Sequence, residues 1–388
     1  MPAHSRQPGL DTLRALAIVL VFLYHYQVFV SHAPTFGWLG NVGWTGVDLF
    51  FVLSGYLIGH QVFAGVARGE RLSLPAFYAR RLLRTMPAFW AVLALYFVFP
   101  VVMGGTTPPP LWRFLTFTQN WGLQPGTAFS QAWSLCIEEQ FYLVLPLVVL
   151  AALRWRGPVA GAWALMALLT GLGLGARAWL WSLHGSEAGP TGTAGYHPWV
   201  YYATLCRFDE FLPGLAVALV RHAHPRTWVR WTAHGNAWLL AGTLAVAAMF
   251  WGVQTRYYVP GVGYGAFMTV AGYSLIAWAF ALWVLAALSP GSWLQRVQVP
   301  GAAALAAWSY AIYLTHKAVA VIVARALAPW QWPLAAEVAV VTAACLAAGW
   351  LLYRAIERPV MRWRDRQVPT LFPRPALGAQ CQAKGSAL

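Results

Sequence analysis

Residues 10–30 read LDTLRALAIVLVFLYHYQVFV, an apolar stretch long enough to cross a membrane as a helix. It carries Arg14 near its start and His25 near its far end. A helix rises ~1.5 Å per residue, so the two are separated by ~16 Å, about half a bilayer core. Ionisable residues inside a membrane helix are costly, which makes both residues candidates for a functional site. The structural alternative is a snorkelling anchor at Arg14 and a hydrogen-bonded bundle histidine at His25.

The composition is that of a protein that crosses the membrane many times. Of 388 residues, 59% are hydrophobic, only 10% are charged and 23 are tryptophan, a residue enriched at membrane interfaces. The net charge is +15, but no basic patch belongs to a soluble fold, so no nucleic-acid partner is expected. Four widely spaced cysteines form no CxxC motif and predict neither a disulfide framework nor a metal site. Polar residues interrupt the first apolar stretch, which argues against a cleaved signal peptide.

Ten apolar segments of spanning length can be counted. They are 11–30, 43–64, 86–104, 136–153, 158–182, 200–220, 236–254, 266–288, 301–324 and 334–356. The sequence therefore predicts an all-α bundle of about ten transmembrane helices. We expect residues 1–366 to form one transmembrane domain and residues 367–388 a short, disordered cytoplasmic tail, with no second soluble domain.

Basic residues predict the orientation, because cytoplasmic links are enriched in lysine and arginine. Alternate links and the C-terminal tail are basic: Arg68, Arg71, Arg80, Arg81, Arg84; Arg154, Arg156; Arg221, Arg226, Arg230; Arg296; and Arg358, Arg362, Arg364, Arg366, Arg374, Lys384. The links 31–42 and 183–199 have none, and 105–135 has Arg113 alone. Both termini are therefore predicted to face the cytoplasm.

The second segment enters from outside and carries three residues of interest. Asp48 lies in its first turns, where an acid suits the positive end of the helix dipole. Ser54 and Gly55 lie near mid-membrane, where small residues let another backbone or a ligand approach closely. Packing is the favoured interpretation of Gly55, and ligand approach is the alternative.

Arginines precede the third segment at the expected cytoplasmic face. Arg81 and Arg84 are three positions apart and share a helical face. Such a cluster can be an ordinary positive-inside feature, or it can gather planar guanidiniums around phosphates. At the end of the last segment, Glu357 is expected to pair with Arg354 or Arg358.

The fourth segment, also entered from outside, begins with two adjacent acids, Glu138 and Glu139. A buried carboxylate needs a partner such as an imidazole or an arginine. Glu138 and His25 are expected at a similar outer depth, so the two can meet. A His–Glu pair of this kind would hold a general base in one tautomer.

Two later segments hold further polar residues. Arg207 and Glu210 are three positions apart and are interpreted mainly as a mutually neutralising pair, with the wall of an acceptor cleft as the alternative. His316 and Lys317 fall near the middle of the ninth segment, and a buried His-Lys step is not expected to face lipid.

Six motifs in this order resemble the membrane acyltransferase 3 family. They are LDTLRALAIVLVFLYH (10–25), GVDLFFVLSGYLI (46–58), FYARRLLRTMPAFW (77–90), WSLCIEEQFYLVLP (133–146), RFDEFLPG (207–214) and SYAIYLTH (309–316). The resemblance covers roughly residues 8–360. The family's motif residues correspond to Arg14 and His25, Arg81 and Arg84, Ser54 and Gly55, and Trp133 through Glu138.

The resemblance implies a multi-pass enzyme of the bacterial inner membrane that moves an acyl group, usually acetyl from acetyl-CoA, to a hydroxyl group. The acceptor would be a surface glycan such as O-antigen or exopolysaccharide, or else a small molecule such as a macrolide sugar. Arg14, Arg81 and Arg84 are expected to hold the CoA phosphates, with Ser54 and Gly55 near the donor. No metal is expected, and the oligomeric state is not indicated.

The resemblance also implies roles on the acceptor side. His25 would deprotonate the acceptor hydroxyl, and Glu138 or Asp48 would orient its imidazole. Both direct transfer and an acyl-histidine intermediate are compatible with this arrangement. Further candidate substrate-binding residues are Arg207, Glu210 and His316.

Two other function classes compete with acyl transfer. Buried histidine, glutamate and arginine also form proton relays, as in a proton-coupled transporter or flippase. The two halves of the chain, however, show no corresponding broken helices. A non-catalytic membrane sensor would bind ligand without turnover.

Overall fold

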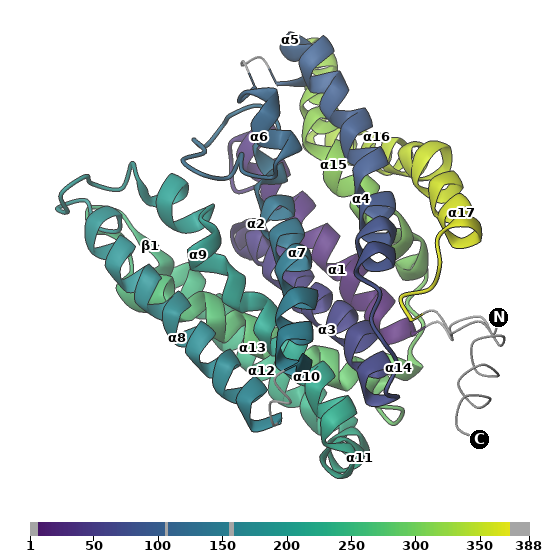
Figure 1. Cartoon of the computed structure of the whole chain (residues 1–388). Helices are drawn as coiled ribbons and strands as arrows, with labels where there is room; N and C mark the ends of the chain where they lie inside the picture. The colour runs from purple at the N-terminus through teal and green to yellow at the C-terminus, as the bar shows by residue number, and fades with distance from the viewer. Residues whose placement is uncertain (1–6, 105–107, 155–158, 373–388) are drawn as a thin grey trace, which may run out of the picture.

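The computed structural model describes residues 7–104, 108–154 and 159–372, which form a bundle of helices (Figure 1). The α-helices are α1 (Pro8–Tyr26), α2 (Gly37–Val42), α3 (Gly46–Ala67), α4 (Leu74–Val98), α5 (Pro100–Met103), α6 (Leu111–Leu115), α7 (Trp133–Arg154), α8 (Val159–His184), α9 (Thr204–Arg207), α10 (Leu212–Ala223), α11 (Pro225–Ala233), α12 (Gly235–Gly252), α13 (Tyr273–Leu288), α14 (Trp293–Arg296), α15 (Ala302–Leu327), α16 (Leu334–Leu352) and α17 (Arg358–Gln367).

Short elements extend or join these helices. The π-helical turns are η1 (Gln27–Ser31), η4 (His197–Tyr201), η6 (Val253–Tyr257), η7 (Met268–Gly272) and η9 (Tyr353–Glu357). The 3-10 turns are η2 (Gly43–Thr45), η3 (Ser130–Ala132), η5 (Phe208–Phe211) and η8 (Ala328–Trp330). The antiparallel strands β1 (Tyr258–Val259) and β2 (Gly263–Tyr264) form a small hairpin.

The predicted all-helical, multi-span class is confirmed, but the predicted number of ten spans is not. Within the described residues, nine helices are long and apolar enough to cross a membrane. The predicted span 200–220 is instead divided among the end of η4, α9, η5 and α10. The backbone leaves helical geometry at Arg207, where φ is −131° and ψ is −12°. Irregular backbone is tolerated at membrane depth where protein surrounds it, and Arg207, Asp209 and Glu210 are all buried.

The broken segment is held by close packing of α10 against α3. A Cβ on Gly55 would meet the main-chain carbonyl of Phe211, and one on Gly214 would meet the carbonyl of Val52. Small residues at such crossings let two helix backbones approach directly. The packing interpretation therefore explains Gly55, because protein backbone fills the space that a ligand would need.

Basic links and links poor in basic residues lie at opposite ends of the bundle. In Figure 1, α11 and α14 lie at one end, and α5 and α6 at the other. The start of α1 lies at the α14 end, where the Gly9 backbone N–H donates to Gln295 Oε1 at 3.3 Å. This arrangement suits the alternation of basic and non-basic links, and the cytoplasmic placement of the termini stays a prediction.

Several sequence predictions fall outside the described residues. The basic residues Arg156, Arg374 and Lys384 and most of the predicted tail are among them. The described part of the chain ends beside α4, where the Ser73 backbone N–H donates to the Leu371 carbonyl at 3.0 Å. Helix α17 ends at Gln367, and the division of the chain at residue 366 stays a prediction.

Candidate active site

Three arginines predicted to bind phosphate come together at the α14 end of the bundle. Arg14 lies on α1, and Arg81 and Arg84 lie on successive turns of α4. Arg14 and Arg84 line one cavity of about 240 Å³, with Asp11, Ala303, Ala306, Ala307, Tyr353 and Met361 as its other lining residues. Helices far apart in the sequence, α1, α4 and α15, therefore enclose one cationic pocket.

The three guanidiniums differ in their partners. Arg84 donates to Glu357 Oε2 at 2.7 Å. Within the described residues, neither Arg14 nor Arg81 has a recorded hydrogen bond or ion pair; the Arg81 guanidinium carbon lies 5.6 Å from the centre of the Tyr142 ring. The donors of these two half-buried guanidiniums could therefore bind an anionic group by charge-assisted hydrogen bonds.

Glu357 corrects one prediction from local sequence. Its carboxylate pairs with Arg84 of α4, and not with the neighbouring Arg354 or Arg358. The Glu357 side chain is fully buried, whereas ion pairs with chain neighbours would leave it near the surface. The contact ties the end of the last span to the arginine pocket.

Tyr142 connects two further predicted site residues to this pocket. Its hydroxyl donates to Glu138 Oε2 at 3.0 Å and lies 3.1 Å from Ser54 Oγ. Glu138 and Ser54 therefore belong with the arginines. Sequence reasoning missed Tyr142, although it lies one helical turn beyond Glu138 and faces the same side of α7.

His25 lies farther along α1 and pairs with His316 of α15. The distance from His25 Nδ1 to His316 Nε2 is 2.6 Å, and the two rings stack with centroids 4.9 Å apart. His316 is buried, and its Nδ1 lies 2.9 Å from the Ile312 carbonyl and 3.0 Å from the Tyr313 carbonyl.

These contacts assign a tautomer to each ring. A carbonyl oxygen only accepts hydrogen bonds, so His316 Nδ1 must carry a proton. With both rings neutral, His316 Nε2 is then an acceptor, and His25 Nδ1–H is its donor. No partner is recorded among the described residues for the remaining nitrogen, His25 Nε2, so its lone pair can act as a general base.

Neither carboxylate predicted to orient His25 does so. No contact between His25 and Asp48 or Glu138 is recorded in the part of the chain that the structure describes; Asp48 pairs with Arg207 and Glu138 with Tyr142. Sequence position indicated similar depths for these residues. It did not indicate the side of each helix that they occupy, and helix packing decides that side.

Lys317 is a neighbouring cation on the same stretch of α15. Its ammonium nitrogen donates to Ser130 Oγ at 2.7 Å and lies 4.0 Å from the centre of the Phe29 ring. Phe29 also contacts His25, with ring centroids 5.5 Å apart. Lys317 has no acidic partner recorded among the described residues, so a positive charge is available close to the His25 imidazole.

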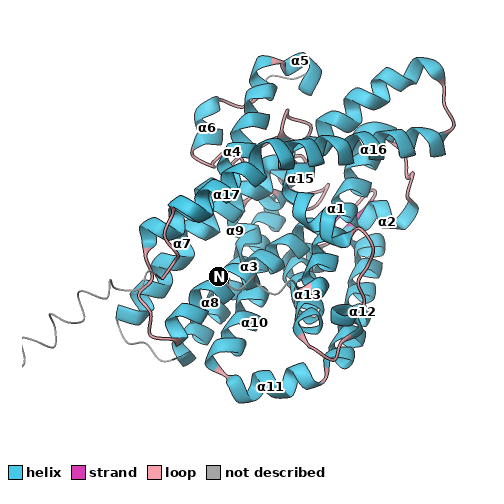
Figure 2. Cartoon of the chain, turned by 90° about the vertical axis from the view of Figure 1, so that its right-hand side faces the viewer, coloured by secondary structure: helices cyan, strands magenta, loops and turns pink. Residues whose placement is uncertain are grey.

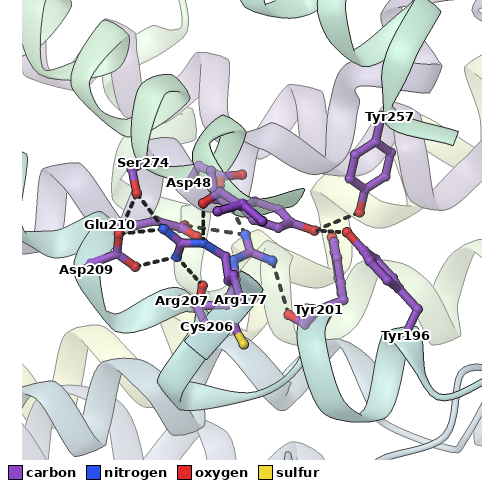
Figure 3. Close-up of polar contacts among 12 residues, drawn as sticks. Asp48, Arg177, Tyr196, Tyr201, Cys206, Arg207, Asp209, Glu210, Tyr257 and Ser274 are labelled. Carbon is purple, nitrogen blue, oxygen red and sulfur yellow. Dashed lines mark hydrogen bonds and ion pairs between the residues drawn. The ribbon is translucent and has the colours of Figure 1, made fainter. Parts of the chain in front are cut away.

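Arg207, Glu210 and Asp48 form a buried ionic cluster (Figure 3). Arg207 donates to Glu210, to Asp48 Oδ1 at 3.0 Å and to the Tyr201 carbonyl at 3.1 Å. All three charged side chains are fully buried. These contacts match the interpretation of Arg207 and Glu210 as a neutralising pair.

A second buried pair beside this cluster was not found from the sequence (Figure 3). Arg177 donates to Asp209 Oδ1 at 2.6 Å and to Oδ2 at 3.0 Å, and it also donates to Ser274 Oγ. The sequence does contain an indication of this pair. An arginine inside the apolar segment 158–182 is costly in a membrane and therefore needs a partner inside the protein. Together the two arginines hold the broken segment between α8, α3 and α13.

Comparisons with known proteins agree with the motifs. The Listeria monocytogenes peptidoglycan O-acetyltransferase OatA is 32% identical over 234 residues, which are 56% of this chain and 35% of that protein. YrhL of Bacillus subtilis is 28% identical over 393 residues, 92% of this chain and 55% of that protein. The O-acetyltransferase OatA of Staphylococcus aureus is 34% identical over 156 residues, 37% of this chain and 24% of that protein.

This chain therefore spans about half or less of the length of these relatives. No solved structure is significantly similar to it. The family model described as an acyltransferase domain matches residues 7–354, nearly the whole chain. The chain is a member of the acyltransferase 3 family.

Proposed function

We propose that this protein is a membrane O-acyltransferase that moves an acyl group, acetyl in the first instance, from acyl-CoA to a hydroxyl of a cell-envelope glycan. The observation that carries the proposal is the hydrogen-bonded row from the α15 carbonyls through His316 to His25. Within the described residues, that row leaves His25 Nε2 with no recorded partner, and the other end of the same helix carries Arg14, which also has none recorded.

The arginine pocket suits the donor. CoA carries several phosphate charges at one end and its thioester at the end of a long arm, and guanidiniums bind phosphate oxygens by charge-assisted hydrogen bonds. In the described part of the chain, Arg14 and Arg81 have no recorded hydrogen-bond partner, while Arg84 is held in place by Glu357. With phosphates in the pocket, the arm would run along α1 toward His25, a rise of ~16 Å.

The transfer step uses His25 as base and then as acid. His25 Nε2 takes the proton of the acceptor hydroxyl while that oxygen attacks the thioester carbonyl carbon. The tetrahedral intermediate collapses with loss of the C–S bond, and the imidazolium returns its proton to the departing thiolate. The products are the O-acyl glycan and free CoA thiol. His316 holds the neutral His25 ring in the reactive tautomer before the proton is taken up, and the same tautomer is restored when the proton is released.

The relatives support a particular acceptor to test first. The Listeria relative is named as a peptidoglycan O-acetyltransferase, which favours peptidoglycan glycan over the O-antigen or exopolysaccharide expected from the motifs alone. A small-molecule hydroxyl remains the second acceptor class, and a bacterial inner-membrane location follows from the same proposal.

The test measures free-thiol release and glycan acylation by the full-length protein in detergent, supplied with acetyl-CoA and soluble peptidoglycan fragments. His25→Ala is expected to lower turnover by about 10²-fold or more, because a positioned general base contributes 10²–10⁴-fold. His316→Leu should lose nearly as much, whereas His316→Gln, whose side-chain oxygen can accept from His25, should retain more.

Size-exclusion profiles and thermal unfolding serve as folding controls for each variant. Transfer that survives in well-folded His25→Ala would contradict the proposed base. Substrate movement across vesicles without any acyl donor would instead support the transporter alternative.

A further inference from the structure

The buried ionic groups around the broken segment include more acids than arginines (Figure 3). Two arginines, Arg177 and Arg207, face three carboxyl groups, those of Asp48, Asp209 and Glu210. All five side chains are fully buried, and every ion pair recorded for them within the described residues stays inside this five-residue set. With all five groups ionised, the set would carry a net charge of −1 in the interior of the protein.

The set lies where protein surrounds it. Asp48 is in the first turn of α3, and α3 runs through the middle of the bundle with α1, α10 and α13 packed against it (Figure 2). An uncompensated charge is very costly at such a place, so a buried ionisable group that lacks a counter-charge takes its neutral form instead. Neutrality of the set requires that one of its three acids carries a proton.

The hydrogen bonds identify two of the acids as carboxylates. Asp209 accepts from Arg177 with both of its oxygens, at 2.6 and 3.0 Å. Glu210 likewise accepts from Arg207 with both oxygens, Oε1 from Nε and Oε2 from Nη2. Such two-oxygen contacts are typical of a carboxylate bound to a guanidinium, and they use each oxygen as an acceptor. Each arginine therefore has one counter-charge without Asp48.

Asp48 is bound differently. Its Oδ1 accepts from Arg207 Nη2 at 3.0 Å, and the same nitrogen also contacts Glu210. Its Oδ2 is buried, and no hydrogen-bond partner is recorded for it among the described residues. The Asp48 and Glu210 carboxyl groups nevertheless lie within hydrogen-bonding reach of each other. Two carboxylates would repel at this contact, whereas a proton on Asp48 Oδ2 turns it into a hydrogen bond to Glu210.

We propose that the five-residue set is a proton-binding site, in which Asp48 is a neutral carboxylic acid that holds the proton on Oδ2 and donates it to Glu210. The dipole of α3 favours a charged acid in its first turn, but that effect is small beside the cost of an uncompensated buried charge. The bound proton makes the set neutral and fastens α3 to the broken segment. This inference goes beyond the proposed acyl transfer and does not depend on it.

Infrared spectroscopy of the full-length protein in detergent detects this proton directly, because a protonated carboxyl group has a C=O stretch that a carboxylate lacks. The difference spectrum between the wild type and Asp48→Asn at neutral pH should contain that C=O band and no loss of carboxylate bands. Asp209→Asn is the matched control, and its difference spectrum should show the loss of carboxylate bands alone. Loss of carboxylate bands in Asp48→Asn without the C=O band would overturn the proposal, and a bound cation in place of the proton would give that result.

Glu210→Gln tests the assignment from the other side of the contact. This change leaves Arg207 without a counter-charge unless Asp48 releases its proton and becomes a carboxylate. Glu210→Gln should therefore give the same difference spectrum as Asp48→Asn, with the C=O band lost and the carboxylate bands kept. A C=O band that persists in Glu210→Gln would contradict a proton on Asp48.

Thermal unfolding gives an independent measurement. Asp48→Asn should keep the melting temperature within about 2 °C of the wild type, because the amide oxygen accepts from Arg207 and the NH2 group replaces the protonated oxygen. Asp209→Asn removes a real counter-charge and should lower the melting temperature by about 5 °C or more. A decrease in Asp48→Asn as large as that in Asp209→Asn, or failure of Asp48→Asn to fold, would overturn the proposal.

Discussion

At the scale of single residues, the reactivity of His25 depends on which of its ring nitrogens carries the proton. Two backbone carbonyls of α15 settle this through His316, because they accept hydrogen bonds and never donate them. In the proposed mechanism, the buried His316 imidazole therefore takes the orienting role that a carboxylate was expected to have. Such a partner orients His25 without placing a negative charge next to it.

Lys317 allows a test of whether a positive charge near His25 contributes to the proposed reaction. We expect its ammonium to stabilise the negative charge that develops on the thioester oxygen, so Lys317→Met should lower kcat about 10²-fold. Ser130→Ala removes the hydrogen bond that anchors Lys317 but keeps its charge, and should change kcat only slightly. Both variants are assayed by thiol release at saturating acetyl-CoA. Equal losses in the two variants would show that Lys317 serves as a structural anchor.

At the scale of elements, the segment from α9 to α10 shows why an apolar stretch need not be one helix. Three charged residues occur within four positions at its start, and all three are buried. Arg207 pairs with Asp48 of α3 and with Glu210 of its own segment, and Asp209 pairs with Arg177 of α8. Satisfying those partners requires a turn at Arg207 that a continuous helix would not allow. The break therefore follows from the ion pairs.

The Arg177–Asp209 pair should contribute strongly to stability. Asp209→Asn leaves a fully buried guanidinium without its counter-charge, a change that typically costs 3–5 kcal/mol. Asp365→Asn breaks a comparable pair with Arg80 at the surface, where the Asp365 side chain is 54% exposed, and should cost less than about 1 kcal/mol. Thermal unfolding in detergent should therefore show a much larger decrease for Asp209→Asn. Similar decreases in both variants would contradict the structural role of the pair.

At the scale of the whole molecule, the proposed reaction requires that the arginine pocket and the far end of α1 face opposite sides of the membrane. The pocket lies beside the start of α1, which contacts α14, whereas the far end of α1 packs against α2. His25 lies between them along α1. The donor and the acceptor would thus approach one base from two compartments.

Cysteine labelling tests this orientation. In a Cys381→Ser background, Ala33→Cys should react with a membrane-impermeant maleimide in intact cells, whereas Arg71→Cys should react only after permeabilisation. Both positions are exposed, and the native cysteines Cys136, Cys206 and Cys345 are buried and should give little background. The opposite labelling pattern would invert the topology and contradict a cytoplasmic donor pocket.

The sequence by itself determined the fold class, the family and several residues of the candidate site. Apolar segments and basic links predicted a helical membrane bundle, because segment length and charge are local properties. The motifs identified the family, and the convergence of Arg14, Arg81 and Arg84 could be expected from their common depth. Ser54, Glu138 and His316 were also recognised as residues of interest, although their partners were not.

Only the tertiary structure decided which side chains contact one another. The pairing of His25 with His316, of Glu357 with Arg84 and of Asp48 with Arg207 joins residues that are 159 or more positions apart. Sequence gives the depth of a residue along its helix, but the direction of its side chain around the helix axis depends on how the helices pack. For the same reason, only packing could divide the predicted span 200–220 and place Arg177 opposite Asp209.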